Sequence, residues 1–280
     1  MSPAEIRAVL ERHGLRARRD LGQNFLADAR VAAKLVAEAH VAPGDFVLEI
    51  GCGLGVLTRA LSLRARSVLA LEVDAGLVRA VRAEGGLPQG AELRHADALE
   101  ADLRALLAAE AAPRRVVANL PYSVSSPLLR RLLDLRDLLA GWAVMVQREV
   151  ALRLLAVPGS RDYGSLTVLH RLVARVERAL DVHPQCFWPV PEVTSSFLRL
   201  EPLAGAPDAE ELAEVERIAR AGFAHRRKTL VNSLRAEGRG GLEALLAESG
   251  VAAGARAEVV APETWLRLAR AAREASLGAG

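Results

Sequence analysis

The sequence predicts an α/β fold, with a doubly wound and mainly parallel sheet followed by a small all-helical domain. Four short apolar runs are typical of buried strands, at residues 46–50, 67–73, 114–119 and 142–147. Segments of helical periodicity separate these runs, which is the pattern of right-handed βαβ units. Later segments are helical, with acidic first turns and glycine breaks. We therefore expect a first domain over residues 1–203 and a helical domain over residues 204–280.

The remaining elements follow from local signals. Residues 1–20 show helical spacing that breaks at Gly14, and Asp28 is a suitable N-cap for a helix that extends to His40. The segment "AELRHA" predicts one further short strand. Two late strand candidates, "RVERALDV" and "SSFLRL", are joined by the proline-rich "HPQCFWPVPEV". This arrangement favours an antiparallel edge of the sheet.

The composition excludes several classes of protein. Of the 280 residues, 51% are hydrophobic and 25% are charged, which is typical of a globular chain. No apolar stretch approaches the ~20 residues of a membrane-spanning helix, and the charged N-terminus lacks the apolar core of a signal peptide. Cys52 and Cys186 lack metal-ligand spacing, so we expect no zinc or other metal site. We expect a cytoplasmic protein without a membrane partner.

A glycine-rich loop follows the first predicted strand of the sheet. In "LEIGCGLGVLT", Gly51, Gly53 and Gly55 separate this strand from a helix, and glycine permits close approach of a ligand to the backbone. The spacing does not match the dinucleotide pattern GxGxxG, and Glu49 beside the loop would repel a pyrophosphate. An acid there suits a ligand with positive charge, such as the amino group of S-adenosylmethionine.

Two further acids end the next two predicted strands. Glu72 in "LALEVD" can accept hydrogen bonds from ribose hydroxyls, and Asp97 in "RHADAL" can accept from an adenine amino group. Each acid alone is equally well explained as a helix N-cap or a solvent-facing strand end. Three acids at the carboxyl ends of successive strands, around one glycine loop, favour a ligand site.

The segment "NLPY" ends the fourth strand, on the same expected edge of the sheet. The amide oxygen of Asn119 and the backbone carbonyl of Pro121 can together hold the two hydrogens of an exocyclic amine. Tyr122 offers a face on which a planar base can stack, worth ~1–3 kcal/mol. The alternative for this segment alone is a turn with a buried tyrosine. The three acids around the glycine loop favour a catalytic role over this alternative, in which the segment positions an amine for reaction.

The chain resembles the small-subunit (16S) ribosomal RNA adenine dimethyltransferases. The resemblance lies in the ordered segments "LGQNFL", "LEIGCGLGVLT", "EVD", "HADAL", "NLPY", "FWPVPEVTSSFLRL" and "FAHRRKTLVNSL". It spans roughly residues 11–235. It implies a Rossmann-like methyltransferase that uses S-adenosylmethionine. Such enzymes dimethylate the N6 amines of two adjacent adenines in the 3′-terminal hairpin of that RNA, during small-subunit biogenesis.

The resemblance also implies roles for individual residues. It places Asn24 and Leu26 at the methionine end of the cofactor, with Gly51 against it in the loop. The remaining cofactor contacts that we expect are Glu49, Gly53, Glu72, Asp97 and Asn119. Asn119, Pro121 and Tyr122 form the catalytic turn, and Phe187 is expected as the second wall of the base sandwich. The resemblance assigns no role to Trp188.

A basic segment, residues 224–235, is the candidate RNA-binding surface. It carries Arg226, Arg227, Lys228 and Arg235 with no acid between them. The alternative is a solvated helix face, which is the usual fate of a charge run. The resemblance favours RNA binding and makes the small ribosomal subunit the expected partner of a monomeric enzyme.

The net charge of the whole chain, +3, carries little weight as evidence for RNA binding. Nearly all basic residues are arginine, and biased codon usage produces the same excess.

Three other functions remain open at the level of sequence. The enzyme could act on an adenine of large-subunit rRNA, as related resistance enzymes do. It could serve mainly as a ribosome-assembly factor whose binding matters more than methylation. A protein-glutamine methyltransferase is less consistent with the sequence, since its usual motif has two prolines and would leave the basic helical domain without a purpose.

Overall fold

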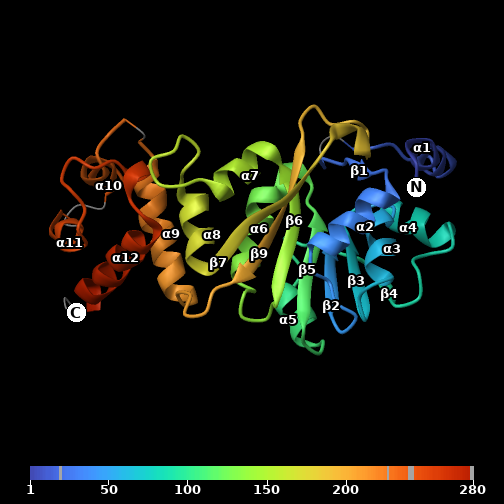
Figure 1. The fold of residues 1–280 in the computed structure, drawn as a ribbon, viewed down its shortest axis with the longest axis horizontal. Coiled ribbons are helices and arrows are strands. Elements are labelled where there is room, and N and C mark those ends of the chain that lie inside the picture. Colours follow the sequence, from blue (N-terminus) through green and yellow to red (C-terminus); the bar gives the residue numbers. More distant parts are fainter. Residues whose placement is uncertain (19–20, 226, 239–242, 278–280) are drawn as a thin grey trace. The chain divides into compact units, whose positions relative to one another are not determined.

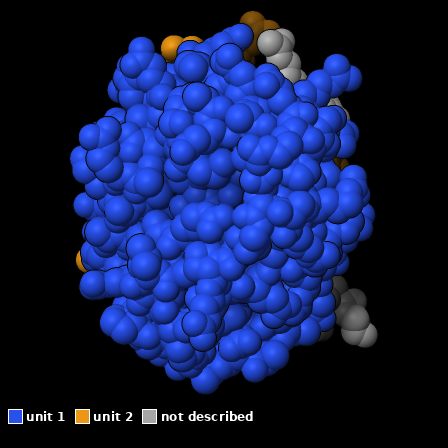
Figure 2. Space-filling model, turned by 90° about the vertical axis from the view of Figure 1, so that its right-hand side faces the viewer, with its two compact units in different colours: residues 1–151, 177–202 blue, residues 152–176, 203–280 orange. Residues whose placement is uncertain are grey.

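The computed structural model describes residues 1–18, 21–225, 227–238 and 243–277, which form two compact units (Figures 1 and 2). The first unit contains Met1–Ala151 and Glu177–Pro202, and the second contains Leu152–Val176 and Leu203–Gly280. Residues 152–176 therefore belong to the same compact unit as the C-terminal helices, whereas the sequence alone places them in the first domain.

Within the described residues, seven strands form one mixed sheet in the order β4-β3-β2-β5-β6-β9-β7. The strands are β2 (Phe46–Ile50), β3 (Ser67–Glu72), β4 (Ala91–His95), β5 (Arg114–Asn119), β6 (Gly141–Gln147), β7 (Ala174–Val182) and β9 (Ser195–Pro202). Strands β2 to β6 pair in parallel, and β9 pairs antiparallel to β6. The chain order reverses between β2 and β5, where ligands bind in open sheets of this kind.

Helices α1 to α6 belong to the first unit. They are α1 (Pro3–Arg12), α2 (Ala29–Glu38), α3 (Val56–Ser62), α4 (Ala75–Ala83), α5 (Leu103–Ala108) and α6 (Ser125–Leu133). Every residue of β2 is buried, and α2 and α3 pack with the sheet residues Val47, Val117 and Met145 in one core cluster. Asp28 caps α2 as predicted, with its carboxylate accepting from the Arg30 and Val31 amides.

A small second sheet joins two segments that are far apart in the sequence. Strand β1 (Phe25–Leu26) pairs antiparallel with β8 (Phe187–Trp188), with Leu26 opposite Phe187. Just before β8, the amide of Ala27 donates to the Cys186 carbonyl at 2.7 Å. These contacts fix the "LGQNFL" segment to the proline-rich segment.

The second unit is helical and contains α8 (Ser165–Val173), α9 (Ala209–Phe223), α10 (Leu230–Ala236), α11 (Glu243–Glu248) and α12 (Pro262–Leu277); α7 (Arg148–Leu155) begins in the first unit and ends in the second. An aromatic cluster forms its core: Phe223 stacks on Trp265 at 5.5 Å and meets Tyr163 edge-on at 5.8 Å. The Tyr163 hydroxyl donates to the Val260 carbonyl. Among the helices that the structure describes, none is both long and apolar enough to span a membrane.

Replacing Gly222 with alanine is expected to destabilise the second unit. Glycine-to-alanine changes inside a helix usually stabilise by up to about 1 kcal/mol. Here a Cβ would lie 2.6 Å from Trp265 and 2.7 Å from Leu230, so overpacking should reverse the sign and cost about 1–3 kcal/mol. Thermal unfolding measures the change. The control is Gly254→Ala, where a Cβ meets nothing within 4 Å, and an equal or smaller effect of Gly222→Ala would contradict the packing argument.

Candidate active site

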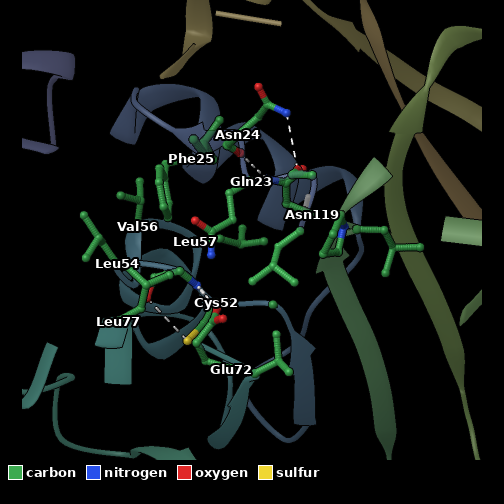
Figure 3. A pocket seen from close by; sticks show the side chains of 18 of the residues that line it. Gln23, Asn24, Phe25, Cys52, Leu54, Val56, Leu57, Glu72, Leu77 and Asn119 are labelled. Atoms are coloured by element: carbon green, nitrogen blue, oxygen red, sulfur yellow. Dashed lines mark hydrogen bonds between the residues drawn. The ribbon is translucent and has the colours of Figure 1, made fainter. Parts of the chain in front are cut away.

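A cavity lies at the carboxyl ends of β2, β3 and β5, at the reversal of strand order. Its space, including the open mouth, is about 730 Å³. The lining residues are 21–26, Glu49, 51–54, Val56, Leu57, Glu72, Val73, Leu77 and 119–122. Figure 3 shows Asn24 and Asn119 together at one end of the cavity, and Cys52 and Glu72 at the other. Most site residues predicted from the sequence therefore meet in one place.

The glycine loop brings the backbone itself to the cavity wall. Gly51 and Gly53 both lie in the left-handed region, at φ +76° and +57°. A side chain at Gly53 would also lie 2.9 Å from the ring of Phe25, which leaves no room for a Cβ. The amide of Gly53 donates to Glu72 Oε2 at 2.8 Å. The loop is thus held open to a ligand by a conformation that only glycine adopts easily.

Glu72 and Glu49 are two buried carboxyl groups beside this loop. Glu72 is 5% exposed, and burial raises its pKa although the amides of Asp74 and Gly53 donate to it. Glu49 is 1% exposed, and burial raises its pKa to about 8, with the nearby Glu72 acting in the same direction. Among the described residues, Glu49 Oε2 has no hydrogen-bond partner. An acid of this kind can receive a donor from a ligand.

Asn119 is oriented by a contact with the N-terminal segment. Its Nδ2 donates to the backbone carbonyl of Asn24 at 3.1 Å. In the described part of the chain its Oδ1 has no partner, so the amide oxygen is available as an acceptor at the cavity. The carbonyl of Pro121 accepts the Val124 amide at 3.2 Å and retains its second lone pair.

Tyr122 begins the short helix η1 (Tyr122–Val124) and lines the cavity. Its hydroxyl lies 2.6 Å from the hydroxyl of Ser195, at the start of β9. Burial raises the pKa of Tyr122, so the side chain is a neutral phenol at neutral pH. The ring is only partly buried, which leaves surface for a planar group.

The prediction that Phe187 forms the second stacking wall is wrong for this structure. Phe187 is 1% exposed and packs in the core cluster with Leu26, Leu35 and Phe197, because its position in β8 turns the ring away from solvent. The ring has no free face and does not line the cavity. Trp188, on the other face of β8, is partly exposed, and the Arg7 guanidinium lies 6.0 Å from its ring centroid.

Asp97 lies outside the cavity lining. It follows β4 as predicted, and its Oδ1 accepts the Leu99 amide at 2.7 Å within a turn. A role with the cofactor adenine stays a prediction. Within the described residues, no group of three or more His, Cys, Asp or Glu side chains could hold a metal ion.

The basic segment of the second unit is partly paired with acids. Arg235 bonds Glu243 at 2.5 Å, and His225 lies 3.0 Å from Glu237. Arg227 and Lys228 are exposed, and Arg226 lies outside the described residues. The phosphate contacts stay a prediction. The two acids, Glu237 and Glu243, lie just beyond the segment that the sequence marks as purely basic.

Sequence reasoning missed the bridge between Gln23 and Asp74. Gln23 lines the cavity, its Nε2 donates to Asp74 Oδ2 at 3.2 Å, and its Oε1 accepts the Arg18 amide at 2.9 Å. Asp74 also caps α4. Gln23 lies within the motif "LGQNFL" and Asp74 lies within "EVD". These two motifs were the signal from which the bridge could have been predicted.

The strand order and the cavity define a Rossmann-like methyltransferase that uses S-adenosylmethionine. The residues fit this cofactor, because the positive-φ glycines expose the backbone and Glu49 keeps an unpaired buried oxygen. A family model described as ribosomal RNA adenine dimethylase matches residues 14–274, and the chain belongs to this family.

Several characterised proteins are similar to this chain. Ribosomal RNA small subunit methyltransferase A of Geobacter metallireducens is 40% identical over 264 residues, covering 92% of this chain and 96% of that protein. The protein of the same name from Geobacillus thermodenitrificans is 40% identical, covering 83% and 81%. Among solved structures, the 23S rRNA methyltransferase ErmE has a TM-score of 0.63 with 30% identity, covering 88% of this chain and 98% of ErmE. A Plasmodium falciparum dimethyladenosine transferase, at 23% identity and a TM-score of 0.73, covers 89% and 98% and supports the fold.

Proposed function

We propose that this enzyme transfers methyl groups from S-adenosylmethionine to the N6 amines of two adjacent adenines in the 3′-terminal hairpin of 16S rRNA. The observation that carries the proposal is the Asn119–Pro121–Tyr122 turn, which lines the same cavity as the glycine loop and Glu72. The small-subunit relatives, at 40% identity over most of the chain, support this substrate.

The reaction depends mainly on holding an amine in place. The cofactor, when bound, supplies an activated methyl group on a sulfonium sulfur. Asn119 Oδ1 and the Pro121 carbonyl accept the two amine hydrogens, which directs the nitrogen lone pair towards that methyl group. Tyr122 stacks on the adenine, which has first been turned out of its helix at a cost of a few kcal/mol. No general base is required, because the amine can lose its proton after attack.

The remaining predicted cofactor residues, which line the cavity except for Asp97, are proposed to hold the cofactor. Glu72 accepts from the ribose, Asp97 from the adenine, and Asn24, Leu26, Glu49, Gly51 and Gly53 contact the methionine end. Arg227, Lys228 and Arg235 are proposed to contact RNA phosphates, which would make binding dependent on salt. The partner is the small ribosomal subunit, bound by a monomeric enzyme in the cytoplasm with no membrane contact.

The test uses labelled S-adenosylmethionine and small ribosomal subunits that lack the modification. Digestion and mass spectrometry should locate dimethyladenine in the 3′-terminal hairpin. Large-subunit RNA serves as the competing substrate, because the chain is also similar to ErmE. Label on that RNA alone, or binding to particles without methylation, would reject the proposal.

Reversing the polarity of the Gln23–Asp74 hydrogen bond should reveal its contribution to cofactor binding. Gln23→Glu places two carboxylates against each other with no donor between them. The variant should therefore bind S-adenosylmethionine about 3- to 10-fold more weakly. Asp74→Asn places two amide NH2 groups against each other and should weaken cofactor binding to a similar extent. In the double variant the introduced carboxylate accepts from the introduced amide, so affinity should return towards wild type. Calorimetric titration measures this, and additive losses would show that no such bridge forms.

A further inference from the structure

The hydroxyl of Tyr122 is held by a group that no proposed step of the reaction uses. Ser195 Oγ lies 2.6 Å from Tyr122 Oη, and Ser195 is completely buried. Ser195 pairs with Gln147 of β6 in the main sheet. The tyrosine therefore has one end in the turn after Pro121 and the other fixed to a strand of the sheet.

A tyrosine on a short turn would otherwise be free to change its rotamer. Asn119 and Pro121 act through atoms at the base of this turn, whereas the ring must lie beside the amine that they hold. A bond at the hydroxyl, on the long axis of the ring, fixes the direction in which the ring points. Fixing that direction before the base arrives avoids an entropy cost on binding.

We propose that Ser195 is a positioning residue for the target base, which acts by holding the ring of Tyr122 in its stacking orientation. This rests on the proposed function, in which Tyr122 stacks on the flipped adenine. Ser195 touches neither adenine nor cofactor in this scheme. Its removal should therefore change events on the RNA side of the reaction and leave cofactor binding unchanged.

The neighbouring Ser196 provides a matched control. It is also completely buried, and its Oγ donates to Asp181 Oδ1 at 2.5 Å. Successive side chains of a strand point to opposite faces, so Ser196 faces away from Tyr122. Ser195→Ala and Ser196→Ala each remove one buried, hydrogen-bonded hydroxyl from β9, and only the first releases Tyr122.

The experiment compares the full-length wild type with Ser195→Ala, Ser196→Ala, Tyr122→Phe and the double variant Tyr122→Phe/Ser195→Ala. The measurements are kcat/KM for methylation of unmodified small subunits, calorimetric affinity for S-adenosylmethionine, and the melting temperature. We expect Ser195→Ala and Tyr122→Phe each to lower kcat/KM by about 3- to 10-fold, as the loss of one hydrogen bond implies. The double variant should be no worse than either single variant, since both remove the same bond. Cofactor affinity should be unchanged.

Three outcomes would overturn the inference. Equal activity losses for Ser195→Ala and Ser196→Ala would indicate a general effect of weakening β9. Additive losses in the double variant, or a parallel loss of cofactor affinity, would show that Ser195 does not act through Tyr122. If the wild type itself leaves the small-subunit adenines unmethylated, the proposed function fails first, and that result is seen before any variant is compared.

Discussion

Replacing Asn119 with alanine is expected to lower the rate of methyl transfer by about 100- to 1,000-fold, the range seen when a preorganised hydrogen-bonding group is removed from an active site. The side-chain amide is fixed through Nδ2 to the Asn24 carbonyl, so its oxygen is presented at a defined position. Alanine removes this acceptor, and the Pro121 carbonyl alone cannot orient both hydrogens of an amine. Single-turnover methylation of unmodified small subunits measures the loss.

Binding measurements decide whether this loss is catalytic. Asn119→Ala should still bind the ribosomal particle, because none of the basic residues of the second unit is altered. Ser126→Ala, an exposed change a few residues further along the chain, should retain wild-type activity. If Asn119→Ala methylates within a few-fold of wild type, the amide does not hold the amine. If it abolishes methylation while particle assembly in cells is normal, the binding role of the protein dominates.

Strands β2, β3, β5 and β6 were predictable because they are largely buried on both faces and therefore form apolar runs. Strands β2 and β5 have the bounds that their apolar runs predict, 46–50 and 114–119. Strands β1 and β8 were not predicted, because two residues are too few to produce a periodic pattern. They exist through pairing between segments more than 150 residues apart in the sequence, and only the folded chain shows this.

Contacts between distant segments also explain which predictions about the site the structure bears out and which it does not. Carboxyl ends of parallel strands meet at one edge, so Glu72 and Asn119 could be placed in one cavity from sequence order alone. Phe187 was assigned to stacking because of its motif, but which face of β8 points into the core depends on its pairing with β1. Arg235 is paired with Glu243, which lies outside the basic segment and carries no local signal of that contact.

Glu49 should make the stability of the ligand-free protein depend on pH. Its pKa is raised from an ordinary 4.5 to about 8 by burial, with Glu72 as a neighbouring like charge. In the unfolded chain the same group ionises above pH 4.5. Its contribution to stability is therefore complete below about pH 4.5 and is lost as the pH rises to about 8, because only the unfolded state releases the proton easily in that interval.

Glu49→Gln removes this dependence and should stabilise the ligand-free protein at pH 8 by on the order of 4 kcal/mol, since each pKa unit is worth 1.36 kcal/mol. Near pH 5 the variant and the wild type should differ little, because a protonated carboxyl and an amide are both neutral. Urea unfolding across this pH range measures the difference. Glu100→Gln, at an exposed acid, is the control for the loss of one carboxylate. A flat difference for Glu49→Gln would mean that Glu49 is already ionised in the folded state.

Binding of the cofactor should lower the raised pKa of Glu49 again. A positively charged ligand group beside Glu49 favours the ionised carboxylate and lowers its pKa. Binding of S-adenosylmethionine below pH 8 should then release a proton from Glu49, and its affinity should rise with pH below about 8. Titration calorimetry in buffers of different ionisation enthalpy measures the proton directly. Glu49→Gln should abolish the release, because in the proposed site Glu49 is the buried acid that contacts the positive charge of the ligand.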